Sequence, residues 1–230
     1  MLYKITLKQN TGFIGKIIAN TLLGAFLTAY STLKDITEKD IMDIVFSDLF
    51  KGGILPIGVK DNSTIYPKGE LPITENITRT MIARDIEDNN IINPMQSVYY
   101  GKSVFYMSTD LIDKTTLEKI IPIMLKFGLG KWRNVGKGQF TLISIEEVET
   151  DTTTKDRIAL CNFIPENNGY GSIKETGYAF RDAIATNGIH QQKVCMLLTG
   201  TKINTDKQFI GKHIFDEASK TYIHGKTILL

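Results

Sequence analysis

Residues 128–140 read Gly-Leu-Gly-Lys-Trp-Arg-Asn-Val-Gly-Lys-Gly-Gln-Phe, which combines four glycines and three cations with no acidic residue. Glycine permits positive φ angles and the close approach of another chain. Consecutive exposed N–H groups can then form concavities that suit phosphate oxygens. Lys131, Arg133 and Lys137 would add positive charge, and Trp132 offers a face on which a base can stack. The segment predicts a loop that binds an RNA backbone.

Other phosphate-binding loops are excluded by spacing. A Walker loop has four residues between its first glycine and its Gly-Lys pair, and Ser or Thr follows the pair. Here five residues separate Gly130 from the pair Gly136-Lys137, and Gly138 takes the Ser/Thr position. A dinucleotide fingerprint would need a glycine at Arg133 and a following helix, but a strand-like run follows. The remaining alternative to RNA binding is a flexible glycine turn with solvated lysines.

The segments around this loop predict an α+β fold. The predicted order is a strand at 3–8, a helix at 21–30, a strand at 41–50, an insertion, a strand at 103–107, a helix at 115–127 and a strand at 139–148. The third run is ambiguous between helix and strand, and Asn20 is a plausible N-cap of the first helix. Residues 52–93 look irregular, although 78–84 could form part of a hairpin. The order resembles a ferredoxin-like (RRM-like) βαββαβ unit.

Two domains are predicted from a polar stretch at residues 149–156. The first covers residues 1–150, with an insertion at about 52–100, and the second covers residues 151–230. The second domain has only short strand-like runs, which predicts a reduced, β-rich unit. These runs are residues 158–164, 193–198 and 222–230.

Composition limits the protein class. The chain has 230 residues, 42% of them hydrophobic, and a net charge of +2, so an anion site must come from local clustering. No stretch approaches the roughly 18 apolar residues of a membrane-spanning helix. Cys161 and Cys195 lack metal-ligand spacing, which favours a reduced, cytoplasmic setting. We expect no metal, no cofactor and no membrane.

The loop resembles the glycine-rich loop of the RAMP superfamily of CRISPR proteins. It is most similar to the family of fourth subunits of the type III-A (Csm) interference complex, which belongs to the Cas-five-like group. That family's loop usually reads Gly-x-Gly-Gly-Lys-Arg-Ser-x-Gly-x-Gly-x-Phe. The matching positions are Gly128, Gly130, Arg133, Gly136, Gly138 and Phe140. Trp132 and Asn134 depart from it, at the usual Lys and Ser positions.

Further similarities are spread along the chain. Residues 19–26 are similar to the family's Ser-Asp-Thr-Leu-Phe-Ser-Ala-Leu, with Ala19 and Asn20 in place of Ser and Asp. Residues 80–84 fall where the family has an Asn-x-Ile-x-Arg segment in its thumb. The other similar segments, in the family's order, are residues 160–165, 194–201, 210–211 and 222–227.

The resemblance implies a fold of two ferredoxin-like units with inserted hairpins and a non-catalytic role. The family member binds the 5′ handle of CRISPR RNA (crRNA) and caps one end of the complex. It contacts the large polymerase-like Cas subunit and the first backbone RAMP subunit, and it meets target RNA only indirectly. The expected RNA-binding residues are Gly128, Gly130, Lys131, Trp132, Arg133, Asn134, Gly136, Lys137 and Gly138, with Lys16, Asn20, Arg79 and Arg84.

Alternatives remain for several of these residues. Arg79 and Arg84 could separate guide and target bases on the thumb, or be ordinary loop cations, and Asn20 has a sufficient role as a cap. The main alternative function is a RAMP-superfamily crRNA-processing endoribonuclease, which commonly uses a histidine. His190, His213 and His224 all lie in the second half, where surface or turn positions are the simpler interpretation. A third possibility is a structural cap that contacts little RNA.

Overall fold

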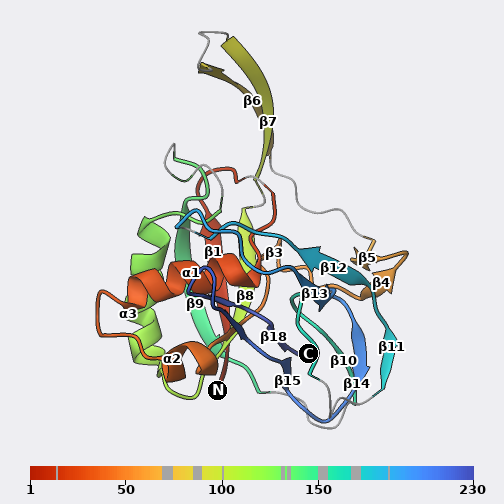
Figure 1. The fold of residues 1–230 in the computed structure, drawn as a ribbon. Helices are drawn as coiled ribbons and strands as arrows, with labels where there is room; N and C mark the ends of the chain where they lie inside the picture. The colour runs from red at the N-terminus through yellow and green to blue at the C-terminus, as the bar shows by residue number, and fades with distance from the viewer. Residues whose placement is uncertain are drawn as a thin grey trace.

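The computed structural model describes residues 1–13, 15–68, 101–130, 133, 136–149, 155–166, 172–185 and 187–230, and the backbone alone of 75–84 and 90–99. The first half contains a central sheet with helices on one side, and the second half lies against the other side of that sheet (Figure 1). The two halves thus enclose a sheet that is covered on both faces.

The central sheet has ferredoxin-like connectivity. Its strands are β1 (Leu2–Gln9), a second strand broken into β2 (Val45–Phe46) and β3 (Phe50–Lys51), β8 (Lys102–Ser108) and β9 (Phe140–Glu147). Strand β1 pairs antiparallel with β8 and β9, and β8 pairs antiparallel with β2 and β3. The spatial order β9-β1-β8-β2/β3 is that of a βαββαβ unit. The predicted α+β fold class is confirmed.

Three helices complete the first half: α1 (Ala19–Tyr30), α2 (Glu38–Asp43) and α3 (Lys114–Lys126). The α3 helix begins where the Asp113 side chain accepts a hydrogen bond from the Thr116 N–H, and it continues through Pro122. Apolar residues of α1 and α3 pack with one face of the sheet into a single buried cluster. The ambiguous run at 41–50 contains the end of α2 and then β2 and the start of β3.

The α1 helix is not capped by Asn20, so that prediction is wrong. Ile18 occupies the N-cap position and makes no side-chain cap bond. Asp48 provides the acceptor instead, because its Oδ1 lies 2.9 Å from the N–H of Ala19. The Asn20 Oδ1 accepts the backbone N–H of His224 at 3.1 Å. The start of α1 is therefore fixed by residues distant in the sequence.

The insertion contains two hairpins, so the prediction that residues 52–93 are irregular is wrong. Strands β4 (Gly58–Lys60) and β5 (Ser63–Ile65) form a short pair. Strands β6 (Glu75–Arg84) and β7 (Asn90–Tyr99) pair in continuous antiparallel register, which confirms the hairpin expected around 78–84. Figure 1 shows β6 and β7 projecting away from the rest of the molecule. The predicted thumb insertion is this hairpin.

The described part of the second half is β-rich and contains no helix. Its strands are β10 (Asp156–Ile158), β11 (Ile173–Glu175), β12 (Tyr178–Arg181), β13 (Val194–Leu197), β14 (Lys202–Asn204), β15 (Phe209–Gly211), β16 (Ile214–Asp216), β17 (Thr221–Ile223) and β18 (Lys226–Ile228). Ile228 of β18 packs in one cluster with Val45, Phe50 and Val104 of the first sheet. This cluster covers the sheet face opposite the helices.

Candidate RNA-binding site

The glycine-rich loop requires glycine at four positions. Gly128, Gly130, Gly136 and Gly138 have φ angles of 69°, 86°, 81° and 63°. Residues with a Cβ rarely adopt such angles, which cost about 1–2 kcal/mol for an L-residue. The glycines that marked the loop in the sequence are therefore needed for its backbone path.

The base of the loop is a close contact between two backbone segments. The Leu129 N–H donates to the Gly138 carbonyl oxygen at 2.8 Å, and the Gly138 N–H donates to the Gly12 carbonyl oxygen at 3.1 Å. A Cβ on Gly138 would overlap the Leu129 carbonyl oxygen. Leu129 itself is buried in the core beside the helices. The loop is thus anchored to the fold at both ends.

The loop lies against the segment that leads into α1. Gln139 accepts the Asn10 N–H at 2.8 Å through its carbonyl oxygen, and its own N–H donates to the Thr11 Oγ1 at 3.0 Å. The rings of Phe13 and Phe140 pack with centroids 5.7 Å apart. These contacts hold the loop against residues 10–13.

A hollow of about 250 Å³ separates the loop from α1. It is lined by Ala25 and Thr28 of α1, by Phe127 and by Arg133 of the loop. Gly24, on the neighbouring turn, is exposed, and a Cβ added there would meet nothing within 4 Å. The small side chains of α1 therefore leave room beside the Arg133 guanidinium for an extended anionic chain.

The glycine N–H groups do not form the predicted phosphate cradle. Those of Gly128, Gly136 and Gly138 donate to the carbonyl oxygens of Leu125, Arg133 and Gly12. These glycines shape the loop, and cationic side chains must supply attraction for phosphate. For Gly130, the predicted contact of its backbone N–H with a phosphate stays a prediction.

The other predicted residues fall into three groups. Arg133 is exposed, Lys137 is half-buried, and Lys16 is exposed just before α1. Arg79 and Arg84 lie on β6, where only the backbone is described. The residues outside the described part of the chain are Lys131, Trp132 and Asn134.

Lys51 is a cation that sequence reasoning missed. Its Nζ lies 5.2 Å from the centroid of the Phe13 ring. Burial lowers the pKa of Lys51, and the positive charge of Lys16 lowers it further. No motif marks Lys51, because it lies on the short edge strand β3 and meets Phe13 only through the fold.

A second cavity, of about 190 Å³, lies at the start of α1 between the two halves. Asn20, Asp48, Asn162, Arg181 and His224 supply its polar lining. Of these, the sequence predicted only Asn20. Asp48 Oδ2 accepts the Thr199 hydroxyl at 2.9 Å. Burial raises the pKa of Asp48, while the Ala19 N–H, the Thr199 hydroxyl and the charge of Lys16 act in the opposite direction.

Two histidines next to this cavity are buried, so the surface interpretation is wrong for them, although both lie in short connections between strands. His213 and His224 are 6% and 1% exposed, and their ring centroids lie 4.8 Å apart. His224 Nε2 accepts the Phe46 N–H at 3.1 Å, and His213 Nδ1 accepts the Gly225 N–H at 3.3 Å. Both rings are therefore neutral, with one nitrogen committed as an acceptor. His190 is exposed.

This pair predicts acid sensitivity. Burial lowers the pKa of His213 to about 4 and that of His224 well below 6.5. Between pH 6.5 and 4 the unfolded chain binds protons that the folded chain excludes, so stability is complete above pH 6.5 and falls as pH decreases. His213 alone would account for about 3 kcal/mol. Urea unfolding at pH 7 and pH 4 should show this loss, and a His213→Gln variant should lose less. An identical pH dependence in the variant would contradict the assignment.

The described residues contain no group of three or more metal-ligating side chains. Within the same residues, no helix is both long and apolar enough to cross a membrane.

Comparisons with solved structures show which known proteins share this fold. No protein-family model and no curated protein matches the chain. A chain of the Csm3–Csm4 subcomplex in the type III-A CRISPR-Cas interference complex matches with TM-score 0.66 at 14% identity, over 100% of this chain and 99% of that chain. A chain of the Csm1–Csm4 cassette in complex with cA4 matches with TM-score 0.56 at 13% identity, over 100% of this chain and 97% of that chain. A chain of the same cassette in complex with one ATP matches with TM-score 0.56 at 12% identity, over 99% of this chain and 97% of that chain. The chain has the fold of these proteins along its whole length, as the loop pattern predicted.

Proposed function

We propose that this chain is a non-catalytic crRNA-binding subunit of a type III-A CRISPR effector complex. Csm4 is the component that the matched subcomplexes have in common, and the sequence resemblance points to the same subunit. The subunit binds the 5′ handle of crRNA and caps the complex beside the large polymerase-like Cas subunit. It also contacts the backbone RAMP subunit, and target RNA reaches it only through the guide.

The observation that carries this proposal is the hollow between the glycine-rich loop and α1. The loop backbone is fixed by Gly128 and Gly138, so Arg133 is held beside a helix face that lacks bulky side chains. Lys51 adds a second cation near the loop, because its Nζ lies 5.2 Å from the centroid of the Phe13 ring, which packs against Phe140. A single RNA strand can meet these cations through phosphate contacts, while guide base pairing supplies sequence discrimination.

The histidines support a role without RNA cleavage. A general base needs a nitrogen that can reach the substrate proton. In His213 and His224 the unprotonated nitrogen already accepts a backbone N–H. His190 is exposed and lies 3.9 Å from Asp182, with its ring in solvent. None of the three is held as the catalytic base of a processing endoribonuclease would be.

The thumb arginines belong to the same proposal. Arg79 and Arg84 lie on the same strand of the projecting hairpin, with backbone partners Met95 and Asn90. We propose that both arginines act on this hairpin where guide and target bases are separated.

Binding to handle RNA tests the proposal. Two crRNAs are compared, with and without the 5′ handle, against the wild type and a Lys131→Ala/Arg133→Ala/Lys137→Ala variant. The wild type is expected to prefer the handle, and the variant to lose affinity. The slope of log affinity against log salt concentration should be shallower by about 2 in the variant, because each of the three lost phosphate contacts contributes about 0.7. A Lys39→Ala/Lys119→Ala/Lys207→Ala variant, which loses the same charge at exposed positions elsewhere, is the control.

Two results would point elsewhere. Specific cleavage of a precursor repeat RNA, abolished by His190→Ala, would establish the processing endoribonuclease. Unchanged RNA binding and complex assembly in the loop variant would indicate a structural cap that contacts little RNA.

A further inference from the structure

Strand β9 is an open edge of the central sheet. Among the described strands it pairs with β1 alone, at one end of the order β9-β1-β8-β2/β3. The Val148 N–H donates to the Leu2 carbonyl oxygen at 2.9 Å, and residues that bond to the partner strand alternate along an antiparallel ladder. Glu147 and Ile145 lie one and three positions before Val148, in continuous register with β1. Their N–H and C=O groups therefore point away from β1.

These outward groups are available to another strand. No backbone hydrogen bond from a described residue outside β1 reaches them. Strand β9 has eight residues, longer than the usual length of about 5–6, and long uncovered edges pair readily with other chains. A bulge at Ile143, which is 56% exposed, interrupts the regular edge on the side of the glycine-rich loop. The segment to which a strand can add is residues 144–149.

This segment is acidic. Glu146, Glu147 and Glu149 are exposed, and none of them forms an ion pair within the described part of the chain. Lys4 lies opposite Glu146 on β1, but Glu146 instead accepts the Ser144 hydroxyl at 2.7 Å. The loop that precedes β9 has cations and no acid. The strand thus leads from an end that attracts RNA to an end that repels it.

The charge selects the kind of neighbour. A polyanion is repelled by the three glutamates, whereas a positively charged protein segment is attracted. A second copy of this strand is disfavoured, because pairing the two copies about a two-fold axis would bring their glutamates close together. An added strand gains affinity from main-chain hydrogen bonds and specificity from its side chains. The edge therefore fits a basic strand of a different protein.

We propose that residues 144–149 accept an extended segment of a neighbouring protein subunit that carries lysine or arginine side chains. The main chain of that segment bonds to Ile145 and Glu147, and its cations meet the glutamates. This inference rests on the proposed function, because the neighbour is a protein of the same effector complex. Figure 1 shows β9 on the α3 side of the molecule, away from β10, β11 and β14. The second half therefore leaves this edge accessible to a neighbour.

Amide hydrogen exchange tests the edge. The full-length chain is measured free, with crRNA alone, and in the complex with the large subunit, the backbone subunit and crRNA. In the free chain the Ile145 and Glu147 N–H groups should exchange fast, while the Glu146 N–H, which points toward β1, is protected. In the complex the two outward groups should slow by on the order of 100-fold. Omitting one protein subunit at a time identifies the one that supplies the strand.

A charge variant tests the complementarity. Glu146→Gln/Glu147→Gln/Glu149→Gln should weaken binding of that protein subunit by on the order of 10-fold at low salt, since several charge pairs are lost. Affinity for handle RNA should stay at the wild-type value, because the glycine-rich loop is unchanged. Equal urea midpoints for variant and wild type would show that folding is intact.

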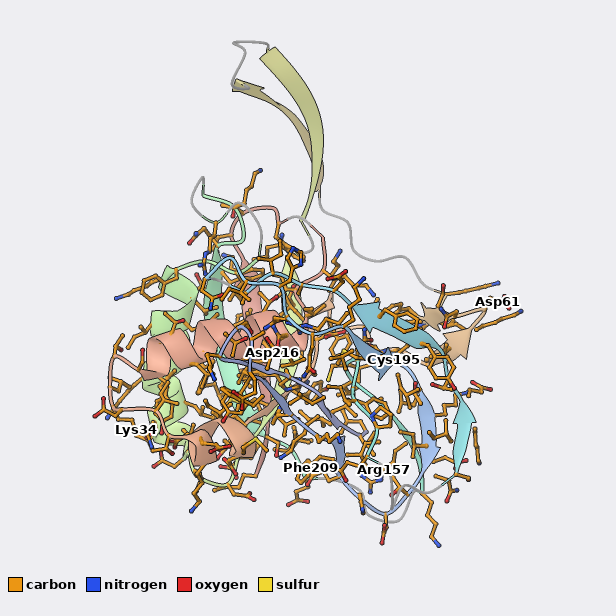
Figure 2. The ribbon with its side chains drawn as sticks, in the orientation of Figure 1. Lys34, Asp61, Arg157, Cys195, Phe209 and Asp216 are labelled. Atoms are coloured by element: carbon orange, nitrogen blue, oxygen red, sulfur yellow. The ribbon has the colours of Figure 1, made fainter. Side chains whose placement is uncertain are left out.

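The matched control removes the same charge elsewhere. Asp35→Asn/Asp61→Asn/Asp206→Asn alters three exposed carboxylates, and Asp61 lies on the far side of the molecule from β9 (Figures 1 and 2). This control should bind the protein subunit as the wild type does.

The alternative is that the glutamates only keep the edge from pairing. The glutamine variant would then associate with itself and still join the complex with wild-type affinity, which would overturn the proposal. Protection of Ile145 and Glu147 by crRNA alone would overturn it as well.

Failure of the edge and failure of the proposed function give different results. If the complex forms and both outward N–H groups exchange as fast as in the free chain, the docking edge is overturned and the proposed function stands. If the chain neither binds handle RNA nor joins these subunits, both proposals fail.

Discussion

Replacing Gly138 with alanine is expected to destabilise the protein by on the order of 4 kcal/mol, the upper end for single substitutions. The new Cβ would overlap the Leu129 carbonyl oxygen, which is backbone and cannot move without Leu129 leaving the core. The φ angle of 63° adds strain of about 1–2 kcal/mol. Urea unfolding measures the loss, and handle RNA binding should fall with it because the base of the loop is displaced.

Gly136→Ala separates the overlap from the strain. Gly136 has a similar φ angle, 81°, but a Cβ there would meet nothing within 4 Å. We expect a cost of only about 1 kcal/mol. Equal unfolding midpoints for the two variants would show that the close contact between Gly138 and Leu129 does not hold the loop.

The second large effect is expected at Asp48. Asp48→Ala removes the acceptor for the Ala19 N–H at the start of α1 and one acceptor for the Thr199 hydroxyl. Loss of a helix cap and a buried bond together predicts about 2–4 kcal/mol of destabilisation. Thermal or urea unfolding would measure it, and retention of wild-type stability would contradict the capping role.

Asp48→Asn should behave differently because the charge is the costly part of this residue. The amide oxygen can accept the Ala19 N–H, its NH₂ can donate to Thr199 Oγ1, and that hydroxyl can donate to Asn162 Oδ1, which lies 3.0 Å away. Burial raises the pKa of Asp48 above 3.8, so its contribution to stability is complete below pH 3.8 and declines as pH rises through the folded-state pKa. At pH 7 the free energy of unfolding of the variant should lie within about 1 kcal/mol of the wild-type value or exceed it. The variant should also lack the decline of stability with rising pH.

The sequence predicted those parts of the protein whose signals are local. The glycines at 128, 130, 136 and 138 indicated a loop that needs positive φ, and alternation with helical runs indicated the βαββαβ order. The helix around 115–127 followed from its apolar periodicity, and α3 occupies residues 114–126. Each of these signals lies within about a dozen residues, the length over which periodicity can be recognised.

The missed features depend on contacts between distant segments. Asp48 caps α1 across 29 positions, and His224 meets Asn20 across 204. No local pattern could distinguish Asn20 as a cap from Asn20 as the partner of a buried histidine backbone. Arg181 and Lys51 gained their roles in the same way, from strands too short for a clear pattern.

The packing of β18 on the first sheet has a consequence during synthesis. The sheet is complete when β9 ends at Glu147, but the strand that covers its second face begins roughly 80 residues later, at Lys226. At about 5–20 residues per second, the ribosome leaves Val45, Phe50 and Val104 uncovered for roughly 4–16 s. During that interval the nascent chain presents an apolar sheet face to the cell, where chaperones are its natural protection against aggregation.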